Sequence, residues 1–264
     1  MNTIFNPTPA AELLIAARHP GDQLSAIPLS IAPSTQVEAY AVQDHIVKRL
    51  AKDLGPVVGY KIGCTNSAAR TLLKVDGPFA GRCFTDAIEN SPAVLRSSEL
   101  HMIGIEPEIA VRIGTDMPAN AAPWTADNVV DSVDQIMPAI EVVESRFSTW
   151  PAVGPLGAVS DNGVHRSLII GSPLSDWTAT MLNDATVVLH CDGAQVDSGV
   201  ATNVDGGPLG ALAWLANHLN ARGNALRTGE LVTTGVMCQI YSGNAGENLV
   251  ADYAALGDVR VQIT

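Results

Sequence analysis

Residues 103–113 read IGIEPEIAVRI, and the alternation of their side chains predicts a β-strand that is apolar on one face. Ile105 and the other aliphatic residues point one way, whereas Glu106, Glu108 and Arg112 point the other. Two acids at positions i and i+2 therefore meet on one face, where their like charges repel each other. A cation between them removes that repulsion, and hard oxygen donors on a rigid strand suit Mg²⁺ or Mn²⁺.

The same spacing also fits a solvated strand face on which Arg112 neutralises Glu108, and on spacing alone this second interpretation is preferred. Glu141 shifts the balance. It lies in PAIEVVE, residues 138–144, where an acid inside an apolar strand is expected to be buried at least in part. A buried carboxylate needs a partner or a metal. The partner is either a cation shared with the first two acids or a core ion pair with Lys61 or an arginine.

Lys61 lies in GYKIG, residues 59–63, within a stretch that predicts a strand over 57–64. Glycines on both sides allow another backbone or a ligand to approach closely. A lysine in that position either binds a substrate carboxylate or shuttles protons. A lysine that extends from a sheet edge into solvent fits the spacing equally well.

Weaker signals come from two turn segments and a histidine. Asp161-Asn162 with the following glycine is typical of a turn, and His165 beside it fits either a surface or a site position. Thr234 and Gly235 end a predicted strand, where backbone N–H groups would face an anion. Ordinary loop chemistry is the preferred interpretation of each segment. The sequence has no P-loop, dinucleotide fingerprint or G-x-S-x-G motif.

Helical periodicity and turn residues predict the remaining elements. Thr35 and Glu38 form a capping box for a helix that ends at Gly55, and Asp127 caps a helix over 128–135. The other predicted helices cover 9–18 and 207–223, a hairpin over 186–199 turns at Asp192-Gly193, and further strands cover 101–114, 136–147, 230–243 and 256–264. Helices first, and then many strands with one embedded helix, indicate an α+β fold.

The chain has 264 residues, of which 47% are hydrophobic and 16% charged, a balance that supports a substantial core. We expect one structural unit, with a helical N-terminal section over 1–56 and a metal-binding catalytic part over 57–264. The net charge of −12 and the lack of a basic run argue against nucleic acid and anionic membrane as partners. The negative net charge does not exclude a small anionic substrate, because a bound cation reverses the sign of the local electrostatic potential.

The four cysteines, at positions 64, 83, 191 and 238, are not spaced as C-x-x-C. They are interpreted as reduced thiols of a cytoplasmic protein. The N-terminal stretch has neither a basic region nor a long apolar run, which indicates no signal peptide. No apolar stretch is long enough to span a bilayer.

Seven short motifs follow one another in an order that resembles a known enzyme family. They are AYAVQ (39–43), GYKIG (59–63), IEPEIAV (105–111), PAIEVVESR (138–146), SDNG (160–163), PLGALAWLAN (208–217) and TTG (233–235). Together they resemble the fumarylacetoacetate hydrolase superfamily, and more closely its 2-oxopent-4-enoate hydratase and 4-oxalocrotonate decarboxylase branch. The resemblance implies a mixed, strongly curved β-roll with a smaller helical N-terminal part, and it implies homo-oligomers.

The resemblance also implies roles for the site residues. The implied metal ligands are Glu106, Glu108 and Glu141. Lys61 would lie beside the bound substrate. The implied pocket residues, which would hold the substrate carboxylate, are Asp161, Asn162, Thr234 and Gly235.

Two departures from the family pattern bear on the reaction. Many hydratases carry an acid after the proline of a D-x-P-D-[FY]-G stretch, whereas Phe79 stands there in this chain. Asp76 is kept and is a candidate for proton transfer. Relatives also often have a serine after the D-N pair, where this chain has Gly163, Val164 and His165. His165 is the second candidate for proton transfer.

The resemblance implies an Mg²⁺-dependent lyase, with Mn²⁺ as the alternative cation, that acts on a small 2-oxo acid. The leading interpretation is a hydratase that adds water to a 2-hydroxy-2,4-dienoate during the catabolism of aromatic compounds. The alternatives are a 4-oxalocrotonate-type decarboxylase, which needs a further contact for a second carboxylate, and an acylpyruvate-type C–C hydrolase. A non-catalytic oligomer that stabilises a pathway partner enzyme is the alternative outside enzymes, and the three retained glutamates argue against it.

Overall fold

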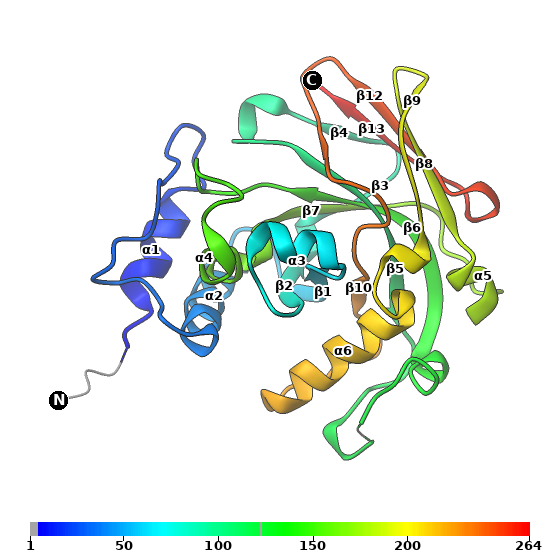
Figure 1. Ribbon diagram of the computed structural model, residues 1–264, viewed down its shortest axis with the longest axis horizontal. Helices are drawn as coiled ribbons and strands as arrows, with labels where there is room; N and C mark the ends of the chain where they lie inside the picture. The colour runs from blue at the N-terminus through cyan, green and yellow to red at the C-terminus, as the bar shows by residue number, and fades with distance from the viewer. Residues whose placement is uncertain (1–4, 122) are drawn as a thin grey trace.

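The computed structural model describes residues 5–121 and 123–264 (Figure 1). Its helices are α1 (Thr8–Ala16), α2 (Gln36–Leu50), α3 (Ser67–Leu73), α4 (Gly154–Ser160), α5 (Ala179–Asn183) and α6 (Gly207–Ala221). Its strands up to residue 143 are β1 (Val57–Gly63), β2 (Phe79–Phe84), β3 (Ile88–Asn90), β4 (Ala93–Leu95), β5 (Gly104–Ile113) and β6 (Val133–Val143). The later strands are β7 (His165–Ile170), β8 (Thr186–Cys191), β9 (Ala194–Val200), β10 (Leu231–Thr233), β11 (Tyr241–Ser242), β12 (Asn248–Asp252) and β13 (Asp258–Ile263).

Two mixed sheets organise these strands. The larger sheet has the order β2-β1-β10-β5-β6-β7-β3, with β11 also paired to β5, and the smaller has the order β4-β13-β12-β8-β9. β1 runs parallel to β10 and β3 runs parallel to β7, whereas β5, β6 and β7 are antiparallel neighbours. The long β5–β6 pair is visibly bent in Figure 1. The predicted α+β class, with its mixed and curved sheet, is confirmed.

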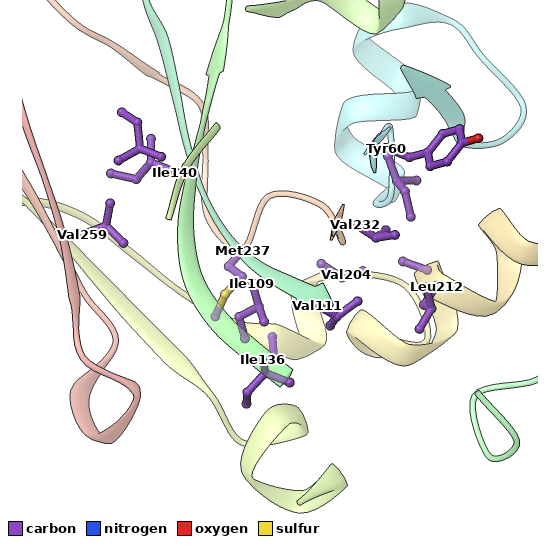
Figure 2. Packing of buried hydrophobic residues seen from close by; sticks show 14 of the residues in the cluster. Tyr60, Ile109, Val111, Ile136, Ile140, Val204, Leu212, Val232, Met237 and Val259 are labelled. Carbon is purple, nitrogen blue, oxygen red and sulfur yellow. The ribbon is translucent and has the colours of Figure 1, made fainter. Parts of the chain in front are cut away.

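The main hydrophobic core lies between the apolar face of β5–β6, the smaller sheet and α6. β5 contributes Ile109 and Val111, α6 contributes Leu212, and β13 contributes Val259. Figure 2 shows part of this cluster, with Leu212 near Val111 and Val232. Because strand side chains alternate, the face of β5 that carries the glutamates is turned away from this core. The fold therefore leaves that face free to build a site.

A second cluster holds the N-terminal helices against the larger sheet. Leu14 of α1 and Ile46 of α2 pack with Phe84 at the end of β2 and with Phe147 after β6. The predicted capping box is confirmed, because Thr35 Oγ1 accepts the Glu38 N–H at 3.2 Å. The division of the chain at residues 56 and 57 stays a prediction, and residues 1–4 lie outside the described part. Across the described residues, each helix is too short or too polar to cross a membrane.

The helix predicted over 128–135 is wrong. The chain there forms a single 3-10 turn, Val130–Ser132, and then enters β6 at Val133. From this point β6 pairs with β5, which satisfies its backbone hydrogen bonds in an extended conformation. Long-range pairing overrides the local cap signal at Asp127.

The strand predicted over 230–243 is interrupted. β10 ends at Thr233, and regular strand pairing with β5 resumes at β11. Between them Gly235 has a φ of 111°, and only single backbone hydrogen bonds from Thr234 and Met237 reach β5 in the described structure. The predicted hairpin is confirmed as β8–β9, with Asp192 and Gly193 both at positive φ. Helices α3, α4 and α5 were not predicted. Each has seven residues or fewer, too few to show a repeating apolar pattern.

Candidate metal centre

The pairing of β5 with β6 brings three glutamates together. Glu106 lies directly opposite Glu141 in the antiparallel register, and Glu108 follows two residues later on the same face. One carboxylate oxygen from each residue lies within 4.8 Å of the other two. Glu108 and Glu141 are fully buried, and Glu106 is half-buried. The alternative of a solvated strand face is wrong, because the Arg112 guanidinium instead donates to Gln135, at 3.2 Å.

The buried oxygens of this cluster fit a divalent cation. Glu108 Oε2 accepts the Gly235 N–H at 2.8 Å, but Glu108 Oε1 has no hydrogen-bond partner in the described part of the chain. Glu141 Oε1 accepts from His165 Nδ1 at 2.8 Å, whereas Glu141 Oε2 has only Lys61 Nζ, 3.4 Å away. Buried carboxylate oxygens require a compensating partner, and three converging carboxylates are a donor set for Mg²⁺ or Mn²⁺. The residues present therefore fit such a metal.

The three carboxylates differ in how readily they ionise. Burial and the charge of Glu141 raise the pKa of Glu106 to about 7, and the same two causes raise the pKa of Glu108 well above its ordinary value. Burial also acts to raise the pKa of Glu141, but Lys61 and His165 outweigh it and hold that pKa below its usual range. Glu141 is thus the carboxylate of the cluster that ionises most readily. A bound cation would favour ionisation of Glu106 and Glu108 as well.

We expect the metal-free protein to lose thermal stability as the pH rises from about 6.5 to about 8, above the range in which His165 and His218, whose pKa values burial lowers, would raise stability with pH. The folded-state pKa of Glu106, about 7, lies above its ordinary value of 4.5, so the folded state binds more protons than the unfolded state between these values. Stability from such a group is present at low pH and is lost as the pH rises through the folded-state pKa. Calorimetric melting temperatures measured in chelator should fall by several degrees, and saturating Mg²⁺ should remove the decline. A metal-free melting temperature that rises over this range would contradict the raised pKa values.

Lys61 is held inside the larger sheet rather than at its edge. β1 lies between β2 and β10, and the Lys61 side chain is 2% exposed. Burial lowers its pKa, but the charges of the three glutamates outweigh burial and raise the pKa above its ordinary value, so the ammonium stays charged. The interpretation of a lysine that extends from a sheet edge into solvent is therefore wrong.

The glycines around Lys61 allow the predicted close approach. A Cβ on Gly59 would lie 2.0 Å from the carbonyl oxygen of Leu231 in β10. A Cβ on Gly63 would lie 2.6 Å from the Phe79 ring and 3.1 Å from Lys61 Nζ. The first glycine admits a neighbouring strand, and the second admits the Phe79 ring beside the ammonium group.

His165 contacts a glutamate of the cluster and is not among the described residues that line a cavity next to that cluster. Its Nδ1 lies 2.8 Å from Glu141 Oε1, and its Nε2 is buried with no partner in the described residues. Burial lowers the pKa of His165 despite the opposing effect of Glu141, so the ring is neutral near pH 7. Because a carboxylate only accepts, the ring proton is assigned to Nδ1. His165 thereby orients Glu141.

Asp161 and Asn162 are engaged by the protein itself. Asp161 accepts from the backbone N–H of Arg146 at 3.0 Å, and its other oxygen lies 3.2 Å from Arg146 Nε and 3.4 Å from Arg18. The Asn162 side chain accepts the Arg82 N–H at 2.8 Å and donates to the Arg82 carbonyl at 2.9 Å. Neither Asp161 nor Asn162 is among the described residues that line this cavity. These contacts hold the segment before His165 against β2, against Arg146 after β6 and against Arg18 after α1.

Thr234 and Gly235 support a metal ligand. Thr234 donates its N–H and its hydroxyl to the Ile109 carbonyl, and Gly235 donates its N–H to Glu108. A Cβ on Gly235 would lie 1.9 Å from Thr65 Oγ1, so only glycine fits there. Asp76 is exposed and is absent from the described cavity lining. The substrate-holding and proton-transfer roles implied for these residues stay predictions.

A cavity of about 740 Å³ opens beside the glutamate cluster. Its lining includes Lys61 and Glu106 at the metal end, and Lys61 is the one cationic side chain among the described lining residues. Sequence reasoning missed most of the rest. The missed lining residues include Thr65, Leu72, Trp150, Asp197, Asn203 and Ile240. They are spread from the loop after β1 to the loop before β11, and no local pattern marks them as neighbours.

A model of the fumarylacetoacetate (FAA) hydrolase C-terminal family matches residues 57–264. The chain belongs to the fumarylacetoacetate hydrolase family. This member is 28% identical over 253 residues to 2-keto-4-pentenoate hydratase of Paraburkholderia xenovorans strain LB400, across 96% of this chain and 93% of that relative. It is also 29% identical over 228 residues to 4-oxalocrotonate decarboxylase of Pseudomonas putida, across 86% of this chain and 85% of that relative.

Solved structures of 4-oxalocrotonate decarboxylase from Pseudomonas putida G7 match this family member over the whole of both chains. The complex with calcium and acetate has a TM-score of 0.88 at 25% identity, and the complex with magnesium and adipate has a TM-score of 0.89 at 24% identity. The family and the fold implied by the sequence motifs are confirmed. Both curated names denote lyases, so the prediction of a lyase is confirmed at the level of the enzyme class.

Proposed function

We propose that this enzyme is an Mg²⁺-dependent hydratase that adds water to a 2-hydroxy-2,4-dienoate, through its unsaturated 2-oxo acid form, in the catabolism of aromatic compounds. One observation carries the proposal. Three convergent glutamates, two of which have a buried oxygen without a hydrogen-bond partner in the described residues, stand at the end of a cavity whose one described cationic lining residue is Lys61. A cytoplasmic homo-oligomer is part of the same proposal.

Glu106, Glu108 and Glu141 would hold the metal, and a 2-oxo acid is a suitable ligand for the positions they leave open. A bound divalent cation would polarise the keto oxygen and stabilise the negative charge that develops on it. The 25%-identical decarboxylase was crystallised with calcium and acetate, a divalent cation with a carboxylate, which supports this pairing.

Lys61 would act as a hydrogen-bond donor to the substrate. Its raised pKa keeps it charged, and a charged ammonium group donates but does not accept a proton. The Thr65 hydroxyl, which lines the cavity and is buried without a partner in the described residues, offers a second polar contact. His165 would act on the reaction through Glu141. Asp76 has no part in the proposed mechanism, because its side chain lies outside the cavity lining.

The charges of the cavity favour water addition over decarboxylation. The substrate 4-oxalocrotonate has a carboxylate at each end, so a decarboxylase needs a group that accepts the second one. Lys61 is committed to the metal end by its ion pair with Glu141, and the other charged side chains among the described lining residues, Glu106 and Asp197, are acids. A decarboxylase stays the second candidate because that enzyme matches this fold over the whole of both chains.

Incubation of the purified protein and Mg²⁺ with 2-hydroxypenta-2,4-dienoate is expected to bleach the dienoate absorbance and to yield a water adduct. Release of CO₂ from 4-oxalocrotonate should be slower by about two orders of magnitude, because its second carboxylate would be left unpaired. Ultraviolet spectroscopy and mass spectrometry of the products measure both reactions, and EDTA should stop them. Faster release of CO₂ than addition of water would overturn the hydratase assignment.

A further inference from the structure

Beyond its metal end, the cavity is walled by large apolar side chains. They include Leu72, Leu73, Phe79, Val143, Trp150 and Ile240, from α3, β2, the end of β6 and two loops. Leu72 is 57% exposed and Ile240 is 37% exposed. Side chains of this size that stay in contact with water around a cavity are typical of a surface that an apolar ligand covers.

The cavity is also larger than the head of the substrate. A five-carbon 2-oxo acid has eight non-hydrogen atoms, and at the roughly 30 Å³ that a water molecule takes in the liquid these would fill about 240 Å³. That is about a third of the 740 Å³ available. The remaining space has room for a substituent attached to the far end of the acid.

The charges of the lining restrict what that substituent can be. Lys61 Nζ lies 3.4 Å from Glu141 Oε2, so the one described cation of the lining belongs to the metal end. The Asp197 carboxylate is held in the lining by the N–H groups of Ser198 and Gln239, at 2.8 and 2.9 Å. A second carboxylate on the substrate would meet the Asp197 carboxylate and no further cation among the described lining residues, whereas an alkyl or aryl group against Leu72 and Ile240 would bury hydrocarbon.

We propose that the wall formed by Leu72, Trp150 and Ile240 binds an uncharged apolar tail, so that this site selects 2-oxo acids with a hydrocarbon substituent longer than that of a five-carbon acid. The inference rests on the proposed function only for the 2-oxo acid head group. Leu72 and Ile240 are its specificity-determining residues, because they are the large apolar side chains of the lining that water reaches most.

Calorimetric titration of the Mg²⁺-loaded protein with 2-oxobutanoate, 2-oxohexanoate and 2-oxooctanoate tests the proposal without turnover. The Kd is expected to fall by about threefold for each added methylene group. The dicarboxylate 2-oxoadipate, matched in carbon number to 2-oxohexanoate, should bind at least about tenfold more weakly. Equal Kd values along the series, or tighter binding of 2-oxoadipate than of 2-oxohexanoate, would overturn the proposal.

Two variants and a control locate the effect. Leu72→Ser and Ile240→Ser should each reduce the ratio of Kd for 2-oxobutanoate to Kd for 2-oxooctanoate by about fivefold. Val37→Ser removes an apolar side chain that is 75% exposed on α2 and is not in the lining, so it should leave the ratio unchanged. An unchanged ratio in both cavity variants would place the tail elsewhere and would overturn the assignment. Chain-length selectivity without any hydration of dienoates would instead overturn the hydratase proposal and leave this one standing.

Discussion

Replacement of Glu108 by glutamine is expected to weaken divalent-metal binding by more than about 100-fold and, at about pH 8, to stabilise the metal-free protein by about 1–2 kcal/mol. Glu108 is fully buried, and one of its oxygens has no hydrogen-bond partner among the described residues. Glutamine has the same shape but no charge to repel Glu106 and Glu141. The variant therefore shows whether the charge of Glu108 is needed for metal binding or for the stability of the fold.

Manganese titration followed by electron paramagnetic resonance measures the affinity, and calorimetry with and without Mg²⁺ measures the stability. Glu12→Gln, at an exposed position of α1, is the matched control and should change neither quantity. If Glu108→Gln bound Mn²⁺ as tightly as the unmodified protein, Glu108 would not be a ligand. A large loss of metal-free stability would show instead that its charge serves the fold.

Replacement of Lys61 by methionine is expected to destabilise the metal-free protein by about 3–5 kcal/mol, because it removes the cation that faces the buried Glu141 charge. Saturating Mg²⁺ should restore most of this loss, since the metal takes over neutralisation of the carboxylates. Activity of the metal-loaded variant should stay about 10²–10³-fold low, because the hydrogen-bond donor beside the substrate is gone.

Chemical denaturation in EDTA and in Mg²⁺ measures the two stabilities of this variant, and the dienoate assay measures its rate. Lys48→Met, at an exposed position of α2, supplies the same substitution without a buried partner and should behave as the unmodified protein. A Lys61 variant that keeps full activity with Mg²⁺ would remove Lys61 from the proposed mechanism.

The strand patterns predicted the glutamates well because alternation is a local property. It placed Glu106 and Glu108 on one face, and the apolar surroundings of Glu141 indicated burial, which the structure shows. Alternation does not specify which strand is the neighbour or in what register. That Glu106 lies opposite Glu141 depends on the order of strands in the sheet, and only the structure shows it.

The residues around the glutamates were harder to predict because their partners are distant in sequence. Asp161 was expected to face the pocket, yet it lies 3.4 Å from Arg18, which is 143 residues away. His165 reaches Glu141 from β7, where the pairing with β6 shifts register between Val142 and Val143. Local turn signals carry no information about either contact. The failed helix after Asp127 has the same cause, since pairing with β5 outweighs a local cap.

The cavity wall is the part of the site that the sequence predicts least. Leu72 comes from a helix of seven residues, and Trp150 and Ile240 come from loops. Without a periodic element around them, nothing in their spacing indicates a shared surface. Their contribution to substrate choice follows only from the way the chain folds around β5 and β6.

Diffraction from a crystal soaked with Mn²⁺ and pyruvate tests the central claim most directly, because manganese scatters anomalously and pyruvate is a minimal 2-oxo acid. The account predicts one anomalous peak among Glu106, Glu108 and Glu141, with an oxygen of each about 2.1–2.2 Å away and pyruvate on the same ion. An anomalous peak at other residues, or no peak at this cluster at saturating Mn²⁺, would contradict the account.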